Sequence, residues 1–234
     1  MNKILSIVIP VYNNWINTNY CLTYLSSLDK SYEIIIVDNG STDGTDKNIK
    51  KYIESMHNLI YIRNDKNIGF GAAVNMGFKK STGQIVMFLN NDIKIKDKSL
   101  IWLEELCNFI LKNNSMLVGP TGGFVDINNN FNFKYETSDI NQRINYMSAW
   151  CLSAKRDVWN LLIIKGQDGP FDSKNFFAYF EDTDLGFRSK QQNIIFHIYP
   201  LPISHIGQQT SKFLNTNQLY LNSKYNFIKK WKIK

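Results

Sequence analysis

The sequence has few cysteines, few prolines and no long hydrophobic run. Its three cysteines, Cys21, Cys107 and Cys151, are odd in number, and none stands in a Cys-x-x-Cys pair. This pattern argues against a disulfide framework and against a zinc site, and we expect buried, reduced thiols of a cytosolic protein. The five prolines and the 14% of aromatic residues are typical of a globular chain rather than a disordered one.

No apolar stretch is long enough to cross a bilayer, which takes about 20 residues in a helix. The run near the N-terminus, "ILSIVIPVY" at residues 4–12, is too short, and no small-residue cleavage site follows it. We therefore expect this run to be a buried β-strand of a cytoplasmic protein.

Length and composition favour one large domain. With 234 residues, 44% of them hydrophobic, the chain can bury a single α/β core, with or without a short appendage. The net charge of +7 favours anionic partners such as nucleotides, phospholipid surfaces or nucleic acid, and it does not choose among them.

Strand and helix patterns alternate through the first half of the chain. Four runs rich in β-branched residues, at 4–11, 33–38, 59–63 and 84–90, read as strands, and an amphipathic helical pattern follows each of them. Repeated β-α units predict an α/β fold, with a Rossmann-like, mostly parallel sheet flanked by helices. The second half is less regular, and we expect strands at 116–120, 144–154 and 194–200 and a hairpin at 124–133.

The segments that follow the four predicted strands are polar. Ligands of an open parallel sheet bind beyond the carboxyl ends of its strands. These segments are "PVYNN" with Pro10 and Tyr12, "DNGSTDGT" from Asp38, "RNDKNIGFG" with Asn67 and Gly69, and "NND" with Asn90, Asn91 and Asp92. Each segment alone is typical of a turn, but four of them at one edge of a sheet indicate a nucleotide site.

The end of the fourth strand, "FLNND", is a candidate metal site. Side chains two apart on an extended strand point to the same side, so Asn90 and Asp92 can face one ion. Hard oxygen ligands of this kind suit Mg²⁺ or Mn²⁺ bound to a diphosphate. A turn or a helix cap is the alternative.

Three acids, Glu181, Asp182 and Asp184, follow an aromatic run in "NFFAYFEDTDLGFR" at 175–188. Carboxylates resist burial unless they are paired or have a function, so their place beside large aromatic side chains needs a reason. Asp184 and Arg188 are four residues apart on a predicted helix, a spacing that predicts an ion pair worth a few tenths of a kcal/mol.

Five segments together resemble family 2 glycosyltransferases of the GT-A fold, close to the rhamnosyltransferase-like branch. They occur in the family's order, within residues 4–211. The segments are "SIVIPVYN", "EIIIVDNGSTDGT", "NIGFGAAVNMGFKKSTGQIVMFLNND", "FFAYFEDTDLGFR" and "HIGQQTS". The resemblance implies a GT-A domain at 1–213, with a sugar-nucleotide-binding half at 1–97 and an acceptor and catalytic half at 98–213. Residues 214–234 remain as a basic amphipathic tail.

The resemblance also assigns roles to individual residues. It implies that Asp92 binds a divalent metal, Mn²⁺ or Mg²⁺, and that His205 lies near the metal and the diphosphate. Asn90 stands where the family's metal-binding motif has its first acid. Asp182 matches the catalytic base, with Glu181 beside it as a positioning group. The residues expected to bind the sugar nucleotide are Pro10, Tyr12, Asp38, Asn67, Gly69, Asn90, Asn91 and Asp92.

The activity that the resemblance implies is an inverting transfer of a sugar from dTDP-rhamnose or a UDP-hexose to a glycan or a lipid-linked acceptor. The basic aromatic tail would suit contact with the anionic inner face of a membrane. Two alternatives remain: a glycosyltransferase that acts on modified nucleic acid, which the lack of a basic aromatic run outside the tail makes unlikely, and a non-catalytic nucleotide- or glycan-binding module.

Overall fold

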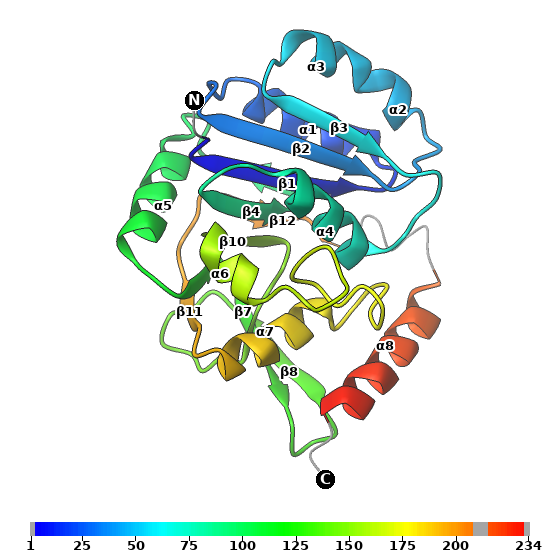
Figure 1. Cartoon of the computed structure of the whole chain (residues 1–234), viewed down its shortest axis with the longest axis vertical. Coiled ribbons are helices and arrows are strands. Elements are labelled where there is room, and N and C mark those ends of the chain that lie inside the picture. The colour runs from blue at the N-terminus through cyan, green and yellow to red at the C-terminus, as the bar shows by residue number, and fades with distance from the viewer. Residues whose placement is uncertain (1–2, 208–214, 232–234) are drawn as a thin grey trace.

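The computed structural model describes residues 3–207 and 215–231. A seven-stranded sheet forms the centre of the molecule, with helices on both of its faces (Figure 1). Only β10 runs antiparallel to its neighbours in this sheet, so the predicted α/β fold with a mostly parallel sheet is confirmed. In order across the sheet, the strands are β11 (Ile195–Ile198), β6 (Met116–Gly119), β10 (Cys151–Lys155), β4 (Ile85–Leu89), β1 (Leu5–Val11), β2 (Tyr32–Asp38) and β3 (Leu59–Arg63).

The central strands are apolar on both faces because each face packs against its own layer of helices. On β1, Ile7 and Ile9 enter one core, whereas Val8 between them enters the other. The first core takes side chains from α1 (Trp15–Leu25) and α5 (Ile101–Lys112). The second core takes side chains from α4 (Phe70–Lys80), α6 (Arg156–Leu161) and α7 (Glu181–Gln191). Two short helices, α2 (Thr45–Asn48) and α3 (Lys50–Ser55), connect β2 to β3.

The segment 144–154 was expected to form one strand, and this expectation is wrong. It forms β9 (Tyr146–Met147) and β10, which belong to different sheets. A continuous strand could not pair with both, and the turn between them passes the end of β4, where the Asn90 N–H donates to the Trp150 carbonyl at 2.8 Å. The predicted hairpin is confirmed as β7 (Gly122–Asp126) and β8 (Asn132–Thr137), and β7 also pairs with β9 in a three-stranded sheet.

Another strand follows the last one expected. β12 (Ile203–His205) pairs antiparallel with β5 (Ile93–Ile95), and Ile93 lies opposite His205 in the register. The Ile206 N–H also donates to the Asp92 carbonyl at 2.8 Å. This small ribbon brings the end of the chain's last strand back to the end of β4.

The predicted tail contains α8 (Thr216–Trp231), which lies at the same end of the molecule as α7 and β8 (Figure 1). Phe227 is wholly buried in a cluster of aromatic side chains. The apolar side of α8 is therefore covered by the rest of the chain. Residues 208–211 of the last motif and residues 232–234 of the tail lie outside the described residues.

The three cysteines are buried and unbonded, as the sequence predicts. Burial raises the pKa of the Cys21 thiol to about 12. Within the described ranges, no helix combines the length and the apolar character that crossing a membrane requires.

Candidate active site

A cleft of about 580 Å³ opens beyond the carboxyl ends of β1, β2 and β4. Ten of the eleven predicted site residues line it, and only Asp38 does not. Those ten are Pro10, Tyr12, Asn67, Gly69, Asn90, Asn91, Asp92, Glu181, Asp182 and His205. The fold thus brings residues from five separate parts of the sequence to one place.

Asp38 is fully buried at the end of β2 and turns toward β3 instead of the cleft. Its carboxylate accepts hydrogen bonds from the Tyr61 hydroxyl at 2.7 Å and the Ser41 N–H at 2.8 Å, and it forms an ion pair with Arg63. These contacts hold the loop after β2 in place. Asn39, the next residue, is the one that lines the cleft.

A set of amide contacts fixes one end of the cleft. The Asn39 Nδ2 donates to the Gly69 carbonyl at 3.1 Å and to the Asn67 side-chain oxygen at 3.2 Å. Gly69 has a φ of +90°, and a Cβ there would lie 2.5 Å from the Phe177 carbonyl oxygen. That carbonyl also accepts the Phe70 N–H at 3.0 Å. Only glycine fits this close approach between the loop after β3 and the segment before α7.

Asp92, His205 and Asn90 meet at one point of the cleft. His205 Nε2 lies 3.0 Å from Asp92 Oδ1 and 3.2 Å from Asn90 Nδ2. The His205 ring stacks on the Trp150 ring with 5.1 Å between centroids and 3° between planes. The Trp150 indole N–H in turn donates to the Thr121 hydroxyl at 2.8 Å. Asn90 and Asp92 thus face the same partner, although β4 ends at Leu89 and both residues lie in the bend after it instead of on an extended strand.

The start of α7 is strained. Tyr179 and Phe180, which precede the helix, have φ values of +67° and +64°, in the left-handed region that such bulky residues rarely adopt. Backbone strain of this kind persists only where the surrounding structure holds it, often at functional sites. The turn directs Glu181 and Asp182 into the cleft, where the Glu181 Oε2 is buried without a hydrogen-bond partner among the described residues.

Both of these carboxyl groups have raised pKa values. Burial raises the pKa of Asp182 to about 6, and the nearby negative charge of Glu136 adds to this effect. Hydrogen bonds from the Thr183 and Ala149 N–H groups lower the pKa of Asp182 but do not outweigh the burial. Burial and the charge of Asp182 raise the pKa of Glu181 to about 8. Asp182 therefore titrates close to neutral pH.

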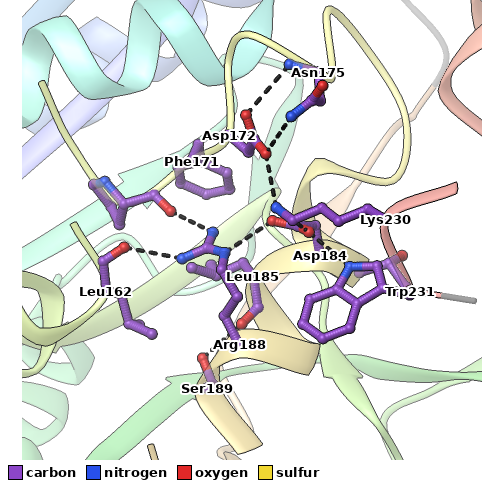
Figure 2. A network of polar contacts seen from close by, with 12 residues as sticks. Leu162, Phe171, Asp172, Asn175, Asp184, Leu185, Arg188, Ser189, Lys230 and Trp231 are labelled. Atoms are coloured by element: carbon purple, nitrogen blue, oxygen red, sulfur yellow. Dashed lines mark hydrogen bonds and ion pairs between the residues drawn. The ribbon is translucent and has the colours of Figure 1, made fainter. Parts of the chain in front are cut away.

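Asp184 points away from the cleft into the network of Figure 2. Its predicted ion pair with Arg188 is confirmed, with 2.8 Å between Oδ2 and Nε. The setting differs from the expected exposed pair, because Asp184 is 0% exposed and also binds Lys230 Nζ at 2.7 Å and the Trp231 indole N–H at 2.8 Å. α8 supplies both of these partners, so the spacing of Asp184 and Arg188 alone could not predict them.

Five residues from β8 up to the start of β10 line the cleft without having been singled out: Glu136, Tyr146, Ser148, Ala149 and Trp150. Glu136 Oε1 accepts hydrogen bonds from the Ser148 hydroxyl at 2.7 Å and from the Thr121 hydroxyl at 3.0 Å. The three-stranded sheet brings these side chains to the cleft, so no local spacing reveals them. The resemblance gave only the weaker signal that residues 98–213 form an acceptor and catalytic half.

Comparison with known proteins agrees with this geometry. The family model described as glycosyl transferase family 2 matches residues 6–165. The chain is 34% identical over 128 residues to glycosyltransferase AglE of Haloferax volcanii, covering 50% of this chain and 41% of the relative. It is 31% identical over 137 residues to a dolichyl-phosphate beta-glucosyltransferase of Dictyostelium discoideum, covering 53% of this chain and 42% of the relative. The chain thus spans less than half the length of either.

Among solved structures, a mannosyltransferase from Pyrobaculum calidifontis in complex with GDP-Man and Mn²⁺ has the same fold. The TM-score is 0.60 at 17% identity, over 86% of this chain and 55% of that one. The sheet and its flanking helices therefore form the GT-A fold that the resemblance implied. With the family match extending over residues 6–165, the chain belongs to glycosyl transferase family 2.

Proposed function

We propose that the protein transfers a sugar from a nucleotide-diphosphate sugar to a hydroxyl group of an acceptor. The observation that carries the proposal is the cleft, which joins polar strand-end loops on one side to a carboxylate of raised pKa, Asp182, on the other. A donor with a nucleotide and a diphosphate suits the first side, and an acceptor hydroxyl that must lose a proton suits the second.

The polar residues at the edge of the sheet would bind the donor. We place the base and ribose near Tyr12, Asn39 and Asn67, since these line the nucleotide end of the cleft. Asp38 acts in this proposal through the loop that carries Asn39, not through direct contact. Either dTDP-rhamnose or a UDP-hexose is the donor we propose.

The residues at the end of β4 fit a divalent metal ion, Mn²⁺ or Mg²⁺. Among the described residues, the cleft is lined by the carboxylates of Asp92, Glu136, Glu181 and Asp182 and by no lysine or arginine. A diphosphate would meet only negative charge there unless a cation accompanied it. Asp92 and His205, with Asn90 beside them, would hold the ion, which would neutralise the charge of the leaving diphosphate.

Asp182 would act as the general base. Its carboxylate takes the proton from the acceptor hydroxyl while the hydroxyl oxygen bonds to the anomeric carbon. The bond from that carbon to the diphosphate oxygen breaks on the opposite face, so the product has the inverted configuration. A pKa near 6 suits this work, because the group is ionised at neutral pH and still basic. Glu181 would orient the acceptor beside it.

The acceptor we propose is a glycan or a lipid-linked hydroxyl. Tyr146, Trp150 and Tyr179 give this side of the cleft aromatic walls of the kind that bind sugar rings, and one relative is named for dolichyl phosphate. Peripheral contact with an anionic membrane is part of this proposal. Because Phe227 is buried, such contact would use the exposed side of α8, which carries Leu221, Tyr225 and Lys229.

A thermal-shift panel of nucleotide sugars, with and without Mn²⁺, tests the proposal. A donor at 100 times its dissociation constant stabilises the folded state by about 2.7 kcal/mol, so the true donor should stand out, and only with the metal. Asp92→Ala should abolish both the shift and turnover, whereas Asp168→Ala, which alters an exposed acid, should abolish neither. The absence of a shift with every nucleotide sugar would reject the proposal. A shift without donor hydrolysis or transfer would favour a non-catalytic binding module.

A further inference from the structure

Residues 172–184, here called the catalytic segment, carry Asp182 and have no regular structure before α7 begins. The two left-handed residues, Tyr179 and Phe180, lie in its middle. Such a segment keeps one conformation only if contacts from elsewhere hold it. Phe70 provides one such contact, through its N–H to the Phe177 carbonyl, and α8 provides several more.

Three polar side chains on one side of α8 bind the catalytic segment. Ser223, Asn226 and Lys230 are three and then four residues apart, which places them on one face of the helix. The Ser223 hydroxyl donates to the Ala178 carbonyl at 2.6 Å, and the Asn226 side-chain amide donates to the Asn175 carbonyl at 2.8 Å. Both carbonyls come just before the left-handed pair.

Lys230 joins the two ends of the catalytic segment. Its ammonium group lies 2.7 Å from a carboxylate oxygen of Asp172 and 2.7 Å from one of Asp184, both of which are buried (Figure 2). Asp184 is also paired with Arg188, so two carboxylates are bound by two cationic side chains. One side chain of α8 thus fixes the positions of the residues that flank Asp182 in the sequence.

Aromatic packing supports the same contact. The Phe227 ring lies 5.1 Å from the Phe180 ring and 6.3 Å from the Phe176 ring, measured between centroids. Phe227 is one residue beyond Asn226, on the same side of α8. The polar anchors and this packing together hold the backbone that turns into α7.

We propose that Ser223, Asn226 and Lys230 are positioning residues that hold the catalytic segment so that Asp182 points at the acceptor hydroxyl. The proposal rests on the proposed function, since it assigns α8 to the same reaction. It makes α8 part of the active enzyme although none of these three side chains lines the cleft. Small displacements of a reacting group cost much rate, so loosening this contact should slow the chemical step without weakening donor binding.

The test compares two asparagines of α8. Asn226→Ala, alone and with Ser223→Ala, removes the anchors, whereas Asn222→Ala changes an exposed asparagine four residues earlier. Below the melting temperature of all variants, we expect the double variant to lose about tenfold to a hundredfold in kcat. Donor KM should stay within about twofold of wild type, because the donor loops are intact. Amide hydrogen exchange at 175–184 should accelerate in the Asn226 variants and not in Asn222→Ala.

Lys230 is tested by a second pair of variants. Lys230→Met leaves two buried carboxylates short of a cation, whereas Lys230→Arg keeps the charge, so Arg should retain more kcat than Met. If Lys230→Met does not fold, the Ser223 and Asn226 variants still decide the matter. Unchanged exchange at 175–184 in the double variant would overturn the proposal, and so would faster exchange with wild-type kcat. A wild-type protein that neither hydrolyses nor transfers any donor would instead reject the proposed function, while the exchange result would still show whether α8 holds the segment.

Discussion

The first turn of α7 has one side that faces the cleft and one side that faces α8, and its acidic residues have different partners on the two sides. On the cleft side, Asp182 accepts hydrogen bonds from uncharged groups, the Thr183 hydroxyl and the Thr183 and Ala149 N–H groups, and Glu181 Oε2 has no partner among the described residues. Burial raises the pKa of both carboxyl groups. On the α8 side, Asp184 binds Arg188, Lys230 and Trp231 (Figure 2). The three acids within these four residues therefore differ in their partners: two lack a cation, and the third is bound by two. Tertiary structure, not the local sequence, sets this difference.

In the proposed mechanism, this difference separates a group that does chemistry from a group that stabilises the fold. A buried carboxylate that is bound by cations is a poor base, because those charges stabilise its ionised form. A buried carboxylate that is bound only by uncharged groups destabilises the folded state but can accept a proton. We therefore expect substitutions on the two sides to separate activity from stability.

The largest effect should come from Asp182→Asn, which keeps the shape of the side chain and removes the proton acceptor. We predict a fall in kcat of about 10²- to 10⁴-fold, the usual range for general base catalysis, with donor affinity nearly unchanged. Steady-state kinetics together with donor titration measures both quantities.

The same variant should not lose stability. The pKa of Asp182 is raised above the ordinary aspartate value of 3.8, so its contribution to the free energy of unfolding is fully present below about pH 4 and is lost as the pH rises through about 6. Asparagine stays neutral and avoids this loss, so Asp182→Asn should be at least as stable as wild type at pH 7. A large drop in its melting temperature would place Asp182 with Asp184 as a structural residue.

Asp184→Asn should have the opposite effect. It leaves Arg188 without its carboxylate and Lys230 with Asp172 alone, and breaking a buried ion pair in this way typically costs about 3–5 kcal/mol of stability. This estimate replaces the few tenths of a kcal/mol expected for an exposed pair. Chemical denaturation measures the loss, and a variant within about 0.5 kcal/mol of wild type would show that the network of Figure 2 contributes little.

The pH dependence of kcat sharpens the contrast. Because Asp182 must be ionised to act as a base and its pKa is about 6, kcat should fall by about tenfold per pH unit below that value. A full pH profile of the wild-type enzyme measures this, with protein stability followed in the same buffers as the control. A kcat that stays constant down to pH 4.5 or so would mean that an ordinary, exposed carboxylate or no carboxylate does this work.

Glu181→Gln should have the smallest effect. Its proposed role is to orient the acceptor, so we expect a loss in kcat of less than about tenfold. Because burial and the charge of Asp182 raise the pKa of Glu181 to about 8, Glu181 is protonated where Asp182 titrates, so the acidic limb of the pH profile should not move. A loss as large as that of Asp182→Asn would make Glu181 the stronger candidate for the base.

The sequence predicts the strand-end side of the cleft better than the rest. Buried strands such as β1 and β4 are continuous apolar runs, and the carboxyl ends of parallel strands must gather at one edge, so Asn67 and Asp92 line one cleft. The orientation of Asp38 could not be predicted, because it depends on Tyr61 and Arg63 of the neighbouring strand.

The acceptor side depends on contacts between distant segments. Trp150 reaches the cleft only because the chain leaves β9 and enters the central sheet as β10, and Glu136 only because β8 pairs with β7. The basic aromatic pattern of α8 predicts an amphipathic helix, but the same pattern suits a membrane and a protein surface. The buried Phe227 and the ion-paired Lys230 show that the rest of the chain covers the side of α8 that carries these two residues.

NMR of the product's anomeric proton and carbon, formed by the wild-type enzyme from its true donor, is the most direct test of Asp182 as the base in a single displacement. The account predicts that the configuration at the anomeric carbon is inverted relative to the donor, because the acceptor oxygen attacks opposite the leaving diphosphate. A product with retained configuration would contradict it.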